Sequence, residues 1–138
     1  QINYHIYGSP KYLEKHGFPK NTSDLNKHSF ISFGRGAPSP VYNPDWALKL
    51  GTKDNKKRKT VMKVNSVYGL LLAVQSGVGL AALPDYITVN QPNIVKVLPN
   101  VEGPITEAHF VYPQSMKNVA RVQAFRNFLY SKISEWEF

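Results

Sequence analysis

The sequence predicts an α/β fold, in which helices cover a sheet. A strand-like segment, residues 2–8, leads directly into a helix, and an apolar helix that begins near residue 66 leads into a short apolar run ended by Pro84. The last and longest helix carries an apolar stripe at helical spacing. The 138 residues suffice for one ordinary domain, or for one lobe of a larger assembly, with a core of its own.

Composition excludes several classes of protein. The chain has no cysteine, which rules out a disulfide scaffold, a cysteine-ligated zinc or iron-sulfur site and a thiol nucleophile. Its longest apolar run, Leu70–Val74, is far shorter than the about 20 residues that cross a bilayer, and no secretion signal opens the sequence. We therefore expect a soluble, cytoplasmic protein. Because the first residue is Gln1 rather than methionine, we also expect a fragment or a processed chain.

The first strand and helix are predicted by their residue pattern. Apolar and polar side chains alternate over residues 2–8, as in a strand. A helix should follow at once, because Ser9 is a good N-cap and Pro10 suits the first helical position. Gly17 is a typical C-terminal stop for that helix.

Two short elements and a loop come next. Residues 21–27 predict a short helix with Thr22 or Ser23 as its cap. The imperfect alternation over residues 29–33 predicts a strand. Five glycines and prolines within residues 34–45 then exclude regular structure there.

Half of the formal net charge of +8 lies in one run, residues 53–59. Segments with strand character, residues 46–50 and 60–65, flank the run, and turn residues including Gly51 lie between them, which predicts a hairpin with the basic run at its tip. A solvated tip is the simplest interpretation, and a phosphate-binding loop or a localisation signal is the alternative. The run holds no aromatic residue that could stack on a base.

The most ordered stretch of the sequence follows this run. Apolar residues at helical spacing predict a helix that starts at Val67, is capped by Asn65 or Ser66 and ends at Gly77. Its other positions are also apolar, so we expect this helix to be buried on more than one side. Three strands should follow, over residues 78–83, 94–98 and 108–112.

Residues 118–136 form the longest predicted helix. One stripe of apolar side chains recurs along it at spacings of three and four residues. The members of this stripe are Val122, Phe125, Leu129, Ile133 and Trp136. Because an apolar stripe needs a partner, we expect it to pack on another copy of the chain or to fold back on the rest of this one.

No arrangement of residues typical of an enzyme is found. The four histidines lack metal-site spacing, and the nine acidic residues form no obvious pair. Ser76 ends a helix, whereas a serine nucleophile elbow lies between a strand and a helix. Residues 77–82 fit the letters of the G-x-G-x-x-A dinucleotide pattern, but they follow a helix and open a strand, which is the reverse of the context that the pattern requires. We therefore predict no catalytic residue, no metal and no cofactor.

A binding geometry does remain. In open α/β sheets, ligands lie beyond the carboxyl ends of strands and against helix N-termini, whose free N–H groups attract anions and polar groups. Two predicted termini qualify, one at Ser9 and one at Asn65 and Ser66. Each of these side chains could instead only cap its own helix. That simpler interpretation is favoured for Ser9 and is as good as the binding interpretation for Asn65 and Ser66.

The order of the elements and the residues themselves resemble the effector-binding domain of LysR-type transcriptional regulators. The most specific pieces are SPKYLEKHG, SGVGLAALPDY and the closing HFVYP with RVQAFRNFL. The resemblance covers essentially the whole chain, in the family order. Two departures are Ser23, where the family often carries proline, and the loop at residues 34–45, which is longer and richer in proline than usual.

The resemblance implies a periplasmic-binding-protein-like fold of type II, with two lobes, each a mixed sheet flanked by helices, and a cleft between them. Residues 1–8 would be a strand that crosses the hinge, and residues 9–104 the second lobe. Residues 105–138 would be a returning strand and a C-terminal helix that belong to the first lobe. A winged helix-turn-helix, a linker helix and most of the first lobe would lie outside this chain.

The resemblance also implies where an effector binds. The family's contacts from this lobe lie at the residues before the apolar helix, here Asn65, Ser66 and Val67, and at the strand end, here Phe33 and Gly34. The argument from helix termini independently selects the first of these groups.

The expected function is effector sensing. A small molecule, with anions among the candidates, would enter the cleft, favour one lobe arrangement and bias how an oligomer presents its DNA-binding domains. DNA would be bound only through the N-terminal domain, and no membrane partner is expected. Two alternatives stay open, namely a solute-binding lobe of a transport system and direct nucleic-acid binding through residues 53–59.

Overall fold

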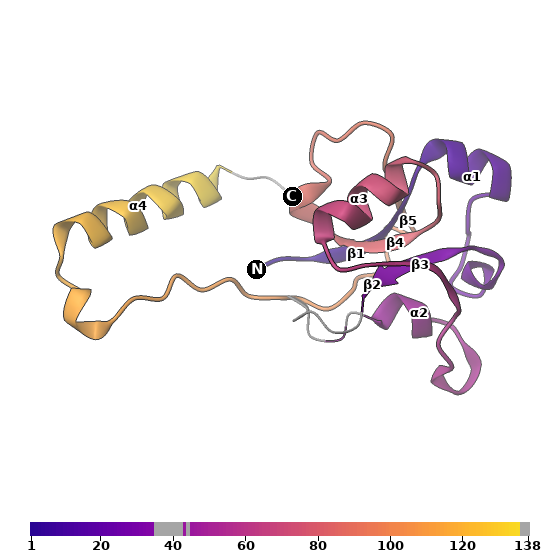
Figure 1. Cartoon of the computed structure of the whole chain (residues 1–138), viewed down its shortest axis with the longest axis horizontal. Coiled ribbons are helices and arrows are strands. Elements are labelled where there is room, and N and C mark those ends of the chain that lie inside the picture. Colours follow the sequence, from indigo (N-terminus) through magenta and orange to yellow (C-terminus); the bar gives the residue numbers. More distant parts are fainter. Residues whose placement is uncertain (35–42, 44, 136–138) are drawn as a thin grey trace. The chain divides into compact units, whose positions relative to one another are not determined.

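The computed structural model describes residues 1–34, 43 and 45–135, and the chain divides into two compact units, Gln1–Thr106 and Glu107–Phe138. Every strand of the described residues lies in the first unit (Figure 1). The helices are α1 (Pro10–His16), α2 (Trp46–Lys49), α3 (Val67–Gln75) and α4 (Ala120–Ser134), and the short 3-10 turns are η1 (Asp24–Lys27), η2 (Lys53–Asn55), η3 (Asp85–Ile87) and η4 (Gln114–Met116). No helix among the described residues has the length and apolar character to cross a membrane.

The strands of the first unit form a mixed arrangement. β1 (Tyr4–Gly8) pairs antiparallel with both β4 (Ala81–Pro84) and β5 (Val95–Val97). β2 (Phe30–Phe33) and β3 (Thr60–Val64) pair in parallel. The two sheets meet at Leu80, directly before β4. Its N–H donates to Ser29 at 2.9 Å and its carbonyl accepts from Ile31 at 2.8 Å.

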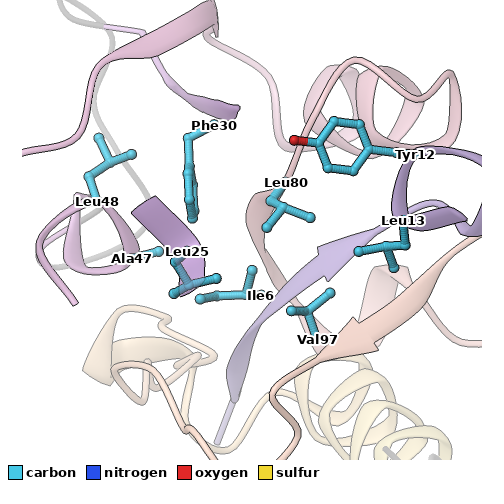
Figure 2. Close-up of a cluster of buried hydrophobic side chains, with 9 residues drawn as sticks. All are labelled: Ile6, Tyr12, Leu13, Leu25, Phe30, Ala47, Leu48, Leu80 and Val97. Carbon is cyan, nitrogen blue, oxygen red and sulfur yellow. The ribbon is translucent and has the colours of Figure 1, made fainter. Parts of the chain in front are cut away.

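Helices cover both faces of these strands, as the α/β prediction requires. One apolar cluster joins residues of α1, η1 and α2 to Ile6, Phe30 and Leu80 (Figure 2). A second cluster joins α3 to Tyr7 and Ile31, among others. Because β1 contributes to both clusters, all five of its residues are buried. This double burial explains why the alternation of apolar and polar residues along β1 does not produce a solvated face.

The first helix begins and ends as predicted. The hydroxyl of Ser9 accepts a hydrogen bond of 3.3 Å from the amide of Tyr12, and Pro10 is the first helical residue. Gly17 adopts a φ of 86° and donates its N–H to the carbonyl of Leu13. A positive φ at this position ends the helix, and glycine adopts it without steric cost.

The cap predicted for the next short helix is correct in position but not in its hydrogen bond. Ser23 is the N-cap residue of η1, but its side chain makes no capping hydrogen bond. The side-chain oxygen of Asn21 accepts instead from the amides of Ser23 and Asp24, at 3.0 and 3.1 Å. Asparagine bonds its own backbone two or three residues on in this way, which makes it an equally good cap in sequence terms.

The strand predicted over residues 46–50 is a helix, α2. Ala47 and Leu48 are buried in the first cluster, and Trp46 and Leu50 pack against it. The amide of Leu50 donates to the carbonyl of Trp46 at 3.1 Å, as in a helical turn. A short apolar run fits a strand or a helix equally well, and here the packing against the core decided between them.

The predicted hairpin is therefore also wrong. β3 follows the basic run as predicted, but it pairs in parallel with β2, whose register partners include Phe33 opposite Val64. Residues 53–59 connect α2 to the start of an edge strand, and they begin with the turn η2. A parallel pair requires a long connection, whereas a hairpin joins antiparallel strands through a short one.

The apolar helix α3 is confirmed, with Ser66 as its cap and Gly77 in a left-handed conformation at φ 80°. Leu70, Leu71, Ala73 and Val74 are buried. The expectation of burial on more than one side is wrong, because Leu72 is 48% exposed. Only one side of α3 faces the strands, so the apolar residues of its other side lie at the surface of the described chain.

The last predicted strand does not form, whereas the long helix does. Within residues 105–112, the only pairing is an antiparallel bridge between Thr106 and Ile2. A strand needs a neighbouring edge for its backbone groups, and the described chain supplies no such edge to residues 107–112. α4 spans Ala120–Ser134 and none of its described residues is buried.

Candidate functional site

The parallel pairing of β2 and β3 brings most of the predicted site together. Phe33 lies opposite Val64, and the amide of Gly34 donates a 2.9 Å hydrogen bond to the carbonyl of Val64. An added Cβ on Gly34 would lie 3.5 Å from the Cβ of Asn65. Both strands therefore end beside each other, and the chain enters α3 directly from this edge.

The N-terminus of α3 forms one side of this site. The hydroxyl of Ser66 accepts a 3.3 Å hydrogen bond from the amide of Gly69. The amides of Val67 and Tyr68 have no partner within the helix, because the first turn of any helix leaves its N–H groups free. Asn65 and Ser66 are both exposed. The arrangement presents backbone donors and two polar side chains to a ligand, and the helix dipole favours an anion there.

A depression in the first unit adjoins this helix terminus. Phe33 and Val67, both predicted site residues, line it. The other lining residues are Tyr4, Phe30, Ile31, Ser32, Trp46, Ala47, Leu48, Leu70, Ala82 and Pro84. None of these described lining residues carries a charge. The depression is small, with an accessible volume of about 30 Å³, and its lining is mainly apolar.

Tyr4 and Trp46 are among the lining residues that were not predicted from the sequence. Trp46 was interpreted as part of a strand, so its position in the site could not be inferred. The indole packs closely against Gly103, where an added Cβ would lie 2.5 Å from the ring. A glycine that accommodates an indole cannot be recognised from sequence pattern alone. The indole Nε1 is buried and has no hydrogen-bond partner among the described residues.

Ser9 does not join the other predicted site residues. It is 1% exposed, and its hydroxyl lies 3.5 Å from where a Cβ on Gly77 would be. Gly77 follows the C-terminus of α3, whereas the other candidates surround the N-terminus of the same helix. The structure thus places Ser9 as a buried helix cap.

The apolar stripe of the last helix lies in the second unit. Val122, Phe125, Leu129 and Ile133 all belong to α4, and Phe125 and Ile133 are 52% and 51% exposed. The ring of Phe125 contacts that of Phe110 edge-on, with ring centroids 5.7 Å apart. Trp136, the last member of the predicted stripe, lies outside the described residues.

A buried polar cluster within the first unit was also missed by the sequence analysis. The carboxylate of Asp85 accepts hydrogen bonds from His5 at 2.8 Å and Tyr7 at 2.9 Å, and Lys96 donates to it at 3.1 Å. Burial alone raises the pKa of Asp85, but the hydrogen bonds from His5, Lys96 and Tyr7 outweigh burial and leave this pKa below its ordinary value. His5 and Tyr7 are two residues apart on a buried strand, which is the one signal that could have indicated a shared partner.

The chemistry of the cluster around Asp85 indicates a structural role. Burial strongly raises the pKa of Tyr7, so this phenol stays protonated and donates. His5, Tyr7 and Lys96 all donate to the carboxylate of Asp85, which links β1, η3 and β5. No group of three or more metal-ligating side chains occurs within the part of the chain that the structure describes.

Comparison with known proteins identifies the family. Residues 2–133 match the model of the LysR substrate-binding domain. The chain belongs to this family. It is 31% identical over 113 residues to an uncharacterised HTH-type transcriptional regulator of Haemophilus influenzae, a match that covers 79% of this chain and 38% of the relative.

Solved structures of LysR-type regulators share the fold. The regulatory domain of CrgA from Neisseria meningitidis matches with a TM-score of 0.71 and 23% identity, over 95% of this chain and 64% of that one. The regulatory domain of AphB from Vibrio vulnificus matches with a TM-score of 0.68 and 16% identity, over 95% of this chain and 65% of that one. The chain thus has the periplasmic-binding-protein-like type II fold of LysR regulatory domains, and it spans about two-thirds of their length.

Proposed function

We propose that this chain is the effector-sensing lobe of a LysR-type regulator, and that a small molecule binds where β2 and β3 end and α3 begins. The family model that matches is that of a substrate-binding domain, and the relatives include an HTH-type transcriptional regulator. The observation that carries the proposal is the juxtaposition of Phe33 and Gly34 with Asn65, Ser66 and Val67 at one sheet edge. Family membership favours a regulator over a transport-type binding protein.

The chemistry of the site suggests the class of effector. Free backbone amides and the side chains of Asn65 and Ser66 suit a carboxylate or another anionic group. The uncharged depression next to them, which includes Phe33, Trp46 and Val67, is small, at about 30 Å³ of accessible volume, and would take a short apolar group. The proposed effector is therefore a small acid with an apolar portion.

In the proposed mechanism, the effector acts by stabilising one arrangement of two lobes. Binding to both lobes at once would favour the closed cleft over the open one, and the shift is limited by the difference in affinity between the two states. The returning segment, residues 105–138, would then belong to the first lobe, and the stripe of α4 would be covered there or by a second copy. The regulator would act in the cytoplasm, where its DNA is.

A thermal-shift screen tests the proposed binding site. A longer chain of this regulator, with both lobes present, would be melted in the presence of a panel of small aliphatic and aromatic carboxylic acids. We expect at least one acid to raise the melting temperature in a concentration-dependent manner, because a ligand that binds only the folded state stabilises it.

Two serines at opposite ends of α3 provide matched variants. Ser66→Trp should abolish the shift, since its bulk would fill the helix terminus, whereas Ser76→Trp should retain it, because the exposed Ser76 lies at the other end of the helix. The absence of a shift from any acid, together with an unchanged regulatory response of the Ser66→Trp protein, would contradict the proposal.

A further inference from the structure

Two segments far apart in the sequence form one basic surface on the first unit. Arg58 links them, because its guanidinium donates to the side chain of Asn26 at 2.9 Å and to the carbonyl of Thr22 at 3.2 Å. Gly51 also lies against Thr22, where an added Cβ would be only 2.6 Å from the hydroxyl. The connection between α2 and β3 is therefore held beside η1 and the residues before it, and it projects beyond α2 in Figure 1.

The surface carries many more cations than anions. Its basic members are Lys53, Lys56, Lys57, Arg58 and Lys59 from the connection between α2 and β3, and Lys20 and Lys27 from the other segment. Two of the lysines are paired, Lys27 with Asp24 and Lys57 with Asp45. Among the described residues, no carboxylate lies within ion-pair range of Lys53, Lys56 or Lys59, and all three are exposed.

This basic surface is built on a fixed support. Besides its bonds to Asn26 and Thr22, the guanidinium of Arg58 donates to the carbonyl of Ala47 at 3.1 Å and lies over the buried ring of Phe30. The backbone amide of Arg58 donates to the carbonyl of Leu48 at 2.9 Å. The lysines next to Arg58 are thus attached to an anchored backbone. Binding of a polyanion should therefore cost little conformational entropy of the chain.

We propose that this surface contacts the phosphate backbone of double-stranded DNA, without regard to base sequence. Lysine ammonium groups act as point charges toward phosphates, and the run at residues 53–59 has no aromatic side chain that could read or stack on a base. This inference rests on the proposed function, because a lobe that belongs to a DNA-bound regulator is exposed to a high local concentration of DNA. That circumstance favours DNA over an acidic protein as the partner.

The proposed DNA contact does not overlap the proposed effector site. The basic run precedes β3 and the effector site follows it, so that the length of this strand, about 13 Å at 3.3 Å per residue, separates them. One lobe can therefore hold an effector and DNA at the same time.

The test is fluorescence anisotropy of a labelled, mixed-sequence DNA duplex titrated with the 138-residue chain at a series of salt concentrations. We expect binding that weakens steeply as salt increases. Neutralising three free lysines, in the variant Lys53→Gln, Lys56→Gln, Lys59→Gln, should weaken binding at least about tenfold. The slope of the logarithm of affinity against the logarithm of salt concentration should fall by about 0.9 for each lysine that contacts a phosphate.

A matched variant separates a defined surface from overall charge. Lys11→Gln, Lys15→Gln, Lys117→Gln removes the same charge from elsewhere and should leave the affinity and the slope close to those of the unaltered chain. Absence of binding at low salt, or equal losses in both triple variants, would overturn the proposal. Binding of polyglutamate as tight as that of the duplex would indicate an acidic protein partner instead. No effector is present in these titrations, so failure of the effector screen leaves their result unaffected.

Discussion

The imidazole of His5 donates a 2.8 Å hydrogen bond to the carboxylate of Asp85, which lies 80 residues further along the chain. Both side chains are buried, at 8% and 6% exposure. The bond fastens the central strand β1 to the turn η3 that ends β4. The backbone adds a second link at the same place, because the amide of Asp85 donates to the carbonyl of Asn3 at 3.0 Å.

Asp85→Asn should lower the free energy of unfolding at neutral pH by about 1–3 kcal/mol, because an amide cannot accept from His5, Tyr7 and Lys96 as a carboxylate does. The pKa of Asp85 is below its ordinary value in the folded chain, so its contribution is complete above the unfolded value, near 3.8, and is lost as the pH falls through the folded value. Urea unfolding from neutral to acidic pH measures both effects.

Asp54→Asn is the matched control for this charge change, because Asp54 is exposed and makes no ion pair among the described residues. It should change stability by less than about 0.5 kcal/mol. A difference between Asp85→Asn and the unaltered chain that persists undiminished at pH values well below 3 would show that the carboxylate is not its origin.

Arg58→Lys should destabilise the first unit by about 1–2 kcal/mol, although it retains the positive charge. A lysine cannot donate at once to Asn26, Ala47 and Thr22 as the guanidinium fork does. The midpoint of urea unfolding should fall without a change in slope. Lys59→Ala, at the exposed neighbouring position, should leave the midpoint nearly unchanged. Equal midpoints for the two variants would mean that Arg58 is only a surface charge.

Gly79→Ala and Gly17→Ala test two different reasons why a position requires glycine, namely a close contact and a positive φ. At Gly79, an added Cβ would lie 2.6 Å from the backbone oxygen of Ser29, the acceptor that joins β2 to Leu80. We expect a cost of about 1–3 kcal/mol from the displaced backbone. At Gly17, nothing lies within 4 Å of the added Cβ, and a cost of about 1–3 kcal/mol is expected from the φ of 86° with a ψ of 159°, which alanine rarely adopts. If calorimetric melting showed no loss of stability for Gly79→Ala, the contact with Ser29 would not be a constraint.

Local signals in the sequence predicted much of the fold correctly. Ser9 caps α1 as expected, Ser66 is the one of the two expected residues that caps α3, and Gly17 and Gly77 follow the helices with positive φ. Caps and helix stops act on backbone groups only a few residues away, so they can be predicted without knowledge of tertiary contacts. The cap argument selected Asn65 and Ser66 of the candidate site, whereas Phe33 and Gly34 were expected only from the family resemblance.

Tertiary contacts account for what the sequence analysis missed. Trp46–Leu50 was expected to be a strand, but it is helical because Ala47 and Leu48 are buried against a core whose other members lie tens of residues away. Because of the same error, Trp46 was not predicted as a site residue, and the connection between α2 and β3 was predicted to be a hairpin. Likewise, nothing near Asp85 in the sequence indicates that His5 and Lys96 are its partners.

Amide chemical-shift mapping tests the central claim most directly. The regulator with both lobes, labelled with nitrogen-15, would be titrated with the small acid that gives the largest thermal shift. The account predicts that the largest changes from this lobe fall on Gly34, Ser66, Val67 and Gly69, and that they disappear in Ser66→Trp. Saturable changes centred elsewhere on the lobe, with these four amides unmoved, would contradict it.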